Sequence, residues 1–108
     1  MIKDILTAAG VEHKQGRFLR MPEGTHAVYF DNIEADTADR VPSVAMPRIY
    51  HHDVTVEVYE PAPDAVTELA IEAELDARGL AWSKQDRYWL KDAQRYQTVY
   101  EFAYTSKT

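Results

Sequence analysis

The sequence predicts an α+β fold: a mixed, mostly antiparallel sheet of about four strands, flanked by an N-terminal helix and a central helix. Three observations predict it. Residues 52–60 alternate between polar and apolar side chains, the pattern of a strand with one buried face. Residues 64–78 have the spacing of an amphipathic helix that ends at Gly79. Residues 81–105 hold two aromatic-rich stretches joined by a short polar link, which is typical of paired strands.

The first 31 residues predict a short helix followed by a strand. Four apolar residues recur at i, i+3, i+4 and i+7 and share one helical face: Ile2, Ile5, Leu6 and Ala9. Gly10 is placed to end this helix. Residues 25–31 then alternate as a strand should.

The strand at residues 54–59 has a clear buried face. Val54, Val56 and Val58 point to one side, and polar residues occupy the positions between them. Pro61 and Pro63 end the strand, because proline has no backbone N–H to donate.

The central helix begins at Asp64, a favourable N-cap residue. One stripe of mostly small residues is expected to pack on the sheet: Val66, Leu69, Ala70, Ala73 and Ala77. Ile71 and Leu75 lie about 140–180° around the helix from Val66. Two interpretations follow. In the first, the helix is rotated or its edges are half-buried. In the second, Ile71 and Leu75 form a second apolar face that contacts a neighbouring subunit.

The C-terminal part predicts two antiparallel strands. Residues 95–104 place aromatic side chains on one parity, which fits a strand with one face against a helix. The short link Lys91–Gln94 favours antiparallel pairing with Tyr88–Leu90.

A long loop is expected at about residues 32–50. This region lacks periodicity and contains Pro42 and Pro47. Four carboxylates in it or directly before it do not match the calcium-loop pattern and are interpreted as a solvated assembly loop: Asp31, Glu34, Asp36 and Asp39.

Composition limits the function. The 108 residues suffice for a single domain, residues 1–108. The net charge of −6 argues against binding nucleic acid by electrostatic attraction. The chain has no cysteine and no apolar run long enough to cross a membrane. No catalytic motif, phosphate-binding loop or cofactor signature appears, so we expect no enzyme, no cofactor and no metal site.

The histidines do not predict a metal centre. His51 and His52 are adjacent on a predicted strand and therefore point to opposite faces. His51 and Asp53 share a face and could bind one metal ion together, with His13 or His26 as a further ligand. A pair of surface histidines, His51 and His52, is the simpler interpretation.

Several short strings resemble one protein family. They are the strand end Val28-Tyr29-Phe30-Asp31, the pair Ala35-Asp36, Tyr50-His51, the helix end Arg78-Gly79-Leu80, and the segment 96–102, YQTVYEF. In this order they resemble the small tail-terminator or head–tail joining proteins of tailed bacteriophages and prophages. The region at 32–50 is longer and richer in proline than that family's pattern.

The resemblance implies a structural role. Such proteins form a homo-oligomeric ring, typically a hexamer, which caps the tail tube and contacts neck or connector proteins. It implies a location in the virion tail or neck after synthesis in the bacterial cytoplasm. DNA would pass through the ring without specific binding, which a negatively charged lumen suits. The alternatives are an α/β adaptor module unrelated to phage, which binds other proteins, and a small enzyme without a recognisable motif.

Overall fold

The computed structural model describes residues 1–35 and 49–107. The elements in chain order are α1 (Ile2–Ala8), β1 (Glu12–Gln15), β2 (His26–Ala35), β3 (Ile49–Glu60), α2 (Ala65–Ala77), β4 (Trp82–Lys84), β5 (Tyr88–Leu90) and β6 (Arg95–Lys107). The α+β class is confirmed, but the sheet has six strands rather than about four. The additional strands are β1 and β4, which are short and carry no alternating pattern.

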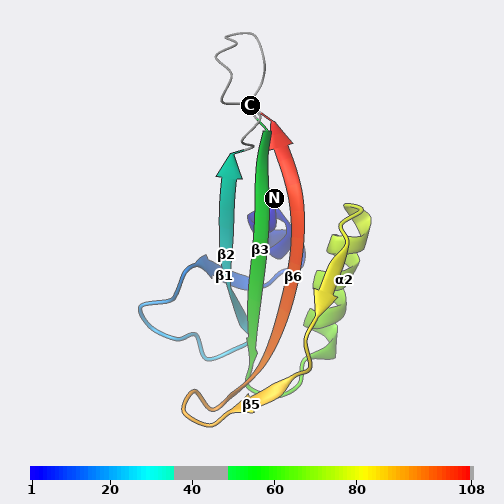
Figure 1. The fold of residues 1–108 in the computed structure, drawn as a ribbon. Helices are drawn as coiled ribbons and strands as arrows, with labels where there is room; N and C mark the ends of the chain where they lie inside the picture. The colour runs from blue at the N-terminus through cyan, green and yellow to red at the C-terminus, as the bar shows by residue number, and fades with distance from the viewer. Residues whose placement is uncertain (36–48, 108) are drawn as a thin grey trace.

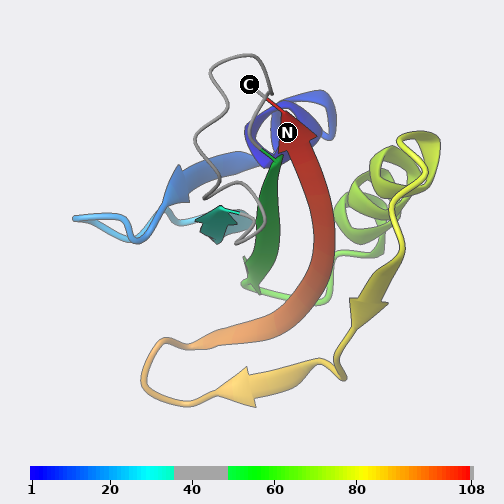
Figure 2. The same ribbon diagram turned by 45° about the horizontal axis from the view of Figure 1, so that its top comes forward.

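The three long strands β2, β3 and β6 form the centre of the sheet, and β3 lies in the middle (Figure 1). All pairings are antiparallel except that between β1 and β2. Figure 2 shows β6 bending strongly along its length. Because of this bend, β6 pairs with β5 near its start and with β4 further along.

Both helices cover the same face of the sheet. The valine face of β3 is confirmed as core: Val54, Val56 and Val58 are all buried. They pack with apolar residues of α1, α2 and β6 in one cluster. Aromatic residues of β6, including Tyr100 and Phe102, complete this cluster. The opposite face of β2, β3 and β6 is covered by neither helix (Figure 1).

The side of α2 that faces the sheet is not the stripe of small residues that the sequence suggested. Ile71 and Leu75 are 0% and 1% exposed and lie in the core, whereas Val66 and Leu69 are 82% and 64% exposed. Of the two interpretations, the rotated helix agrees with this burial, and a subunit interface at Ile71 and Leu75 is wrong. The physical reason is that Glu68, which sequence reasoning would place in water, is buried on the sheet side of the helix.

The region expected to be a long loop is partly strand. β2 continues to Ala35 and β3 begins at Ile49, so that residues 32–35 pair with residues 50–53. Asp31 and Glu34 consequently belong to β2 and not to a loop. Asp36 and Asp39 lie outside the described residues.

The predicted helix ends are confirmed. Asp64 caps α2 by accepting a hydrogen bond from the backbone N–H of Thr67 at 3.0 Å. Gly79 follows the last turn with φ of 68°, a left-handed conformation that favours glycine. Gly10 does the same after α1, with φ of 74°.

Candidate functional site

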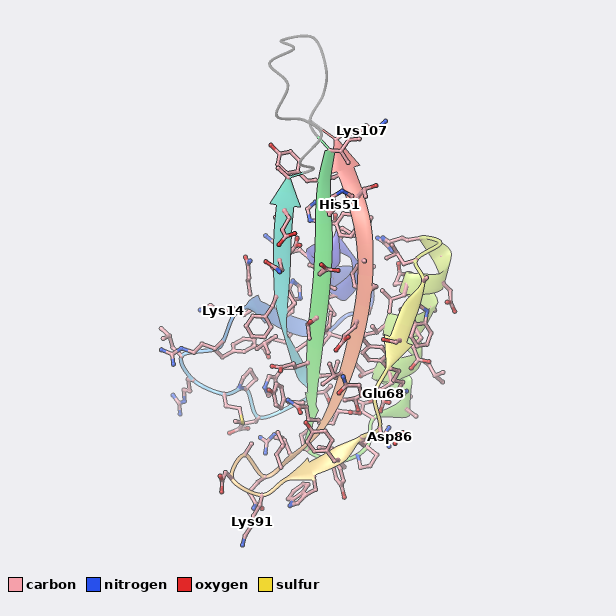
Figure 3. All side chains as sticks on the ribbon, in the orientation of Figure 1. Lys14, His51, Glu68, Asp86, Lys91 and Lys107 are labelled. Carbon is pink, nitrogen blue, oxygen red and sulfur yellow. The ribbon has the colours of Figure 1, made fainter. Side chains whose placement is uncertain are left out.

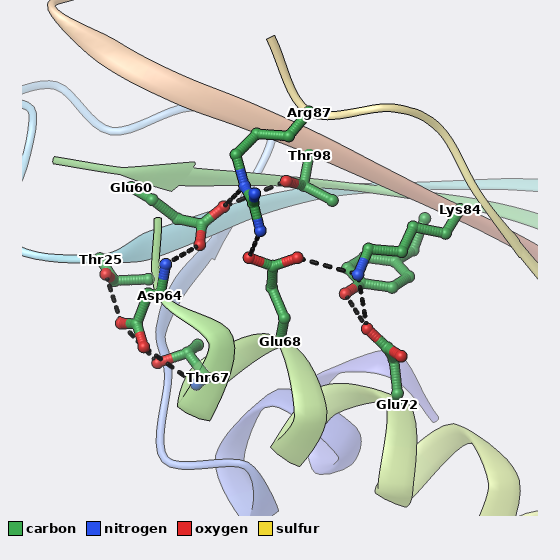
Figure 4. A network of polar contacts seen from close by, with 10 residues as sticks. Thr25, Glu60, Asp64, Thr67, Glu68, Glu72, Lys84, Arg87 and Thr98 are labelled. Carbon is green, nitrogen blue, oxygen red and sulfur yellow. Dashed lines mark hydrogen bonds and ion pairs between the residues drawn. The ribbon is translucent and has the colours of Figure 1, made fainter. Parts of the chain in front are cut away.

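The most elaborate polar arrangement among the described residues is a network of ionisable and polar side chains between α2 and the sheet (Figure 4). It begins at Glu60, the last residue of β3, which follows Val54, Val56 and Val58 on the same parity and so faces the core. Its side chain is fully buried. It accepts hydrogen bonds from the Asp64 backbone N–H at 2.7 Å and from the Thr98 hydroxyl at 3.0 Å.

Two cations complete the network: Lys84, the last residue of β4, and Arg87, which lies between β4 and β5. Lys84 Nζ lies 2.9 Å from Glu68 Oε1 and 2.9 Å from Glu72 Oε2. Arg87 forms an ion pair with Glu68, and its Nε lies 3.7 Å from Glu60. The network therefore joins β3, α2, the end of β4 and the segment between β4 and β5 through side chains.

Tyr100 extends the network into β6. Its hydroxyl donates to Glu72 at 2.7 Å, and Lys84 Nζ lies 5.6 Å from the centre of its ring. Burial and the hydrogen bond to Glu72 raise the pKa of Tyr100, so this phenol stays protonated.

The pKa values of the two buried carboxyl groups, Glu60 and Glu68, are shifted in opposite directions. Burial and the neighbouring Glu68 raise the pKa of Glu60 to about 7. Burial by itself would raise the pKa of Glu68 as well, but hydrogen bonds from Glu60, Lys84 and Arg87 outweigh it and lower that pKa. Glu60 is thus the proton carrier of the pair, and Glu68 is the carboxylate that the cations hold.

This arrangement is suited to holding structure together rather than to catalysis. Glu60 and Glu68 are 0% and 2% exposed, so a substrate has no access to them in this conformation. Their oxygens are already bound by the chain's own donors. The network fixes the β4–β5 segment to α2, and removing one partner would leave a buried charge uncompensated.

The raised pKa of Glu60 predicts that stability falls as pH rises. The folded state binds the proton more tightly than the unfolded chain, in which the pKa is about 4.5. The contribution is fully present below pH 4.5 and is lost as pH rises to about 7, a change on the order of 2–3 kcal/mol. Glu60→Gln, which cannot ionise, should lose less stability between about pH 5 and pH 8 in urea titrations. An unchanged slope in that variant would contradict the assignment.

A second polar group lies near the far end of the long strands. His52 is buried, and its Nδ1 lies 3.0 Å from Asp31 Oδ1 while its Nε2 lies 2.7 Å from Ser106 Oγ. Its ring stacks on Tyr104 with centroids 4.2 Å apart. The interpretation of His52 as a surface residue is therefore wrong. The signal was available, because His52 shares the parity of Val54.

No metal centre is found among the described residues. Within residues 1–35 and 49–107, no three histidine or acidic side chains are grouped as metal ligands. His51 and Asp53 are exposed on the uncovered sheet face, opposite to His52.

Two surface features remain as candidate contact sites. The outer side of α2 exposes Val66 and Leu69 together with alanines, with no charge between them. On the uncovered sheet face, a hollow of about 400 Å³ lies beside the β1–β2 loop and is lined by Phe18, Val28 and Tyr59, among others. Exposed apolar surface of this kind commonly marks a contact with another protein.

Comparisons with known proteins give one informative result. No protein-family model and no curated protein matches the chain. Among solved structures, the chain resembles one in a structure described as "Virion of native gene transfer agent (GTA) particle", with a TM-score of 0.57 and 16% sequence identity. The match covers 96% of this chain and 84% of that chain. The two chains therefore share a fold.

The two described helices were compared with the length and apolarity that a membrane-spanning helix needs. Neither α1 nor α2 is long and apolar enough to cross a bilayer.

Proposed function

We propose that this chain is a structural subunit of a phage-like particle, acting as a tail terminator or head–tail joining protein. The observation that carries the proposal is the shared fold with a chain of a gene transfer agent virion over 96% of this chain. The sequence resemblance to tail-terminator proteins points to the same class of particle. The chain would act in the virion tail or neck without catalysing a reaction.

The surface of α2 supports an assembling protein. Val66 and Leu69 are exposed on a helix whose opposite side is already buried in the core. An apolar helix face that the subunit leaves in water gains free energy when a neighbour covers it. We therefore place one contact of a homo-oligomeric ring, with six copies, on the outer side of α2.

The net charge of −6 fits the same role. A ring of acidic subunits presents a negative lumen, through which DNA passes without being held. The ring would cap the tail tube on one side and contact neck or connector proteins on the other.

Light scattering of the purified protein, alone and with the tail-tube protein from the same genome, tests this function. We expect association that increases with concentration, and tube ends capped by rings in electron micrographs. Leu69→Glu should remain folded and associate more weakly. An adaptor module would bind its partner without forming rings, and a chain that stays monomeric and leaves tubes uncapped would contradict the proposal.

A further inference from the structure

The segment 16–25, which joins β1 to β2, projects from the edge of the sheet as a loop (Figures 1 and 2). We call it the basic loop. Arg17 and Arg20 are exposed, and neither guanidinium has a hydrogen-bond or ion-pair partner within the described part of the chain. Leu19, between them, is 90% exposed. Lys14 lies close by at the end of β1 (Figure 3).

The base of this loop is fixed although its tip is exposed. The backbone N–H of Gly16 donates to the Tyr29 carbonyl at 3.0 Å. At the other end, Arg95 Nη2 donates to the Glu23 carbonyl at 3.1 Å. Phe18 packs edge-on against His26, with ring centroids 5.4 Å apart. A loop held in this way loses less conformational entropy on binding than a free segment would.

The uncovered sheet face has the opposite charge. The register of β2, β3 and β6 places four carboxylates on it: Glu34, Asp53, Glu57 and Glu101. We call this surface the acidic sheet face. Residues 26–35, 49–60 and 97–105 contain no lysine or arginine. Exposed Phe30 lies among these carboxylates, in the same cross-strand row as Glu101.

We propose that the basic loop of one copy docks on the acidic sheet face of a second copy. Arg17 and Arg20 would pair with carboxylates such as Asp53 and Glu101, while Leu19 would cover Phe30. Each copy carries one loop and one face. When these engage two different neighbours, the contact is head-to-tail, and a ring is its closed form. This inference rests on the proposed function only in assuming that copies of the chain meet in one assembly.

A second copy fits this loop better than nucleic acid does. The loop offers only a few cations, in a molecule of net charge −6. A phosphate backbone bound at Arg17 would approach the acidic sheet face of the same copy, because Arg17 and Glu57 line one hollow. A neighbouring copy supplies carboxylates together with apolar surface.

A charge-swap experiment tests the contact. Arg17→Glu/Arg20→Glu makes the loop acidic, and Asp53→Lys/Glu101→Lys reverses the charge at the two positions of the face that the loop would meet. Each variant alone should associate about a hundredfold more weakly than the wild type, because like charges then meet at every contact. An equimolar mixture of the two should associate again, since every loop in an alternating ring then meets a face of opposite charge. Lys3→Glu/Lys107→Glu changes the net charge as much as the loop variant does; it is the control for that variant and should associate normally.

The measurement is sedimentation velocity, with circular dichroism to show that every variant is folded. Restored association in the mixture supports the contact. Loss of association without recovery in the mixture would assign the loop to another partner and overturn the proposal. Normal association of both variants, or no association of any sample, would also overturn it.

The outcome is separable from the proposed function. If the charge variants still form rings and cap tail tubes, the proposed contact is wrong and the proposed function is unaffected. If the mixture recovers association but the wild-type protein does not cap tubes, the contact is supported and the proposed function is wrong.

Discussion

Leu75→Glu is expected to unfold the subunit, whereas Leu69→Glu should leave it folded. Leu75 is 1% exposed and packs in the core with Ile71, while Leu69 is 64% exposed. A glutamate at position 75 loses the apolar contacts and buries an unpaired carboxylate, which costs more than about 4 kcal/mol. The same residue at position 69 meets water, with an expected change within about 0.5 kcal/mol.

Circular dichroism melting and urea titration of the two variants measure this difference. The pair is well matched, because both substitutions replace leucine with glutamate in the same helix. A folded Leu75→Glu beside a collapsed Leu69→Glu would show that α2 has the opposite rotation.

Arg87→Met should be the most damaging substitution among the charged residues. Arg87 pairs with Glu68, whose side chain is only 3% exposed. Its removal leaves a buried carboxylate with Lys84 as its one remaining cation. Breaking a buried pair in this way costs about 3–5 kcal/mol. Arg78→Met is the control, because Arg78 pairs with the partly exposed Glu74 at i, i+4 and should cost less than about 1 kcal/mol.

A double-mutant cycle separates the pair from its surroundings. Glu68→Gln combined with Arg87→Met removes both charges, so the double variant should be more stable than the sum of the single effects implies. Urea titration at about pH 7 of the wild type, the two single variants and the double variant gives the four free energies of unfolding. Additive effects, or equal losses in the Arg87 and Arg78 variants, would contradict the structural role of the network.

The long elements were predictable from local pattern. Apolar alternation identified β3 and the aromatic parity identified β6, because each strand has one face in the core. The strand β1 was missed since its four residues, Glu12–Gln15, are polar and lie at the sheet edge. The three-residue strand β4 is too short to show a period.

The rotation of α2 could not be read from its apolar residues alone. A stripe containing Val66 and Leu69 looks like a core face, yet the helix buries Glu68 beside Ile71 and Leu75. The cations that make this burial possible, Lys84 and Arg87, come from a segment more distant in sequence. The apolar pattern therefore left open which side of the helix faces the sheet.

Part of the polar network did leave a signal in the sequence. Glu60 continues the parity of Val54, Val56 and Val58, so a carboxylate on the core side of β3 was predictable. Its partners were not, because Thr98 and Arg87 reach it only through the folding of β6 and the β4–β5 segment.

The most direct test of a role in tail assembly is electron microscopy of particles from cells in which the gene has been deleted. A protein that caps the tail tube and joins it to the neck should be needed for both steps. We expect tubes of uneven length and heads without tails in the deletion strain, and normal particles when the wild-type gene is restored. Normal tails joined to heads in the absence of the gene would contradict the account.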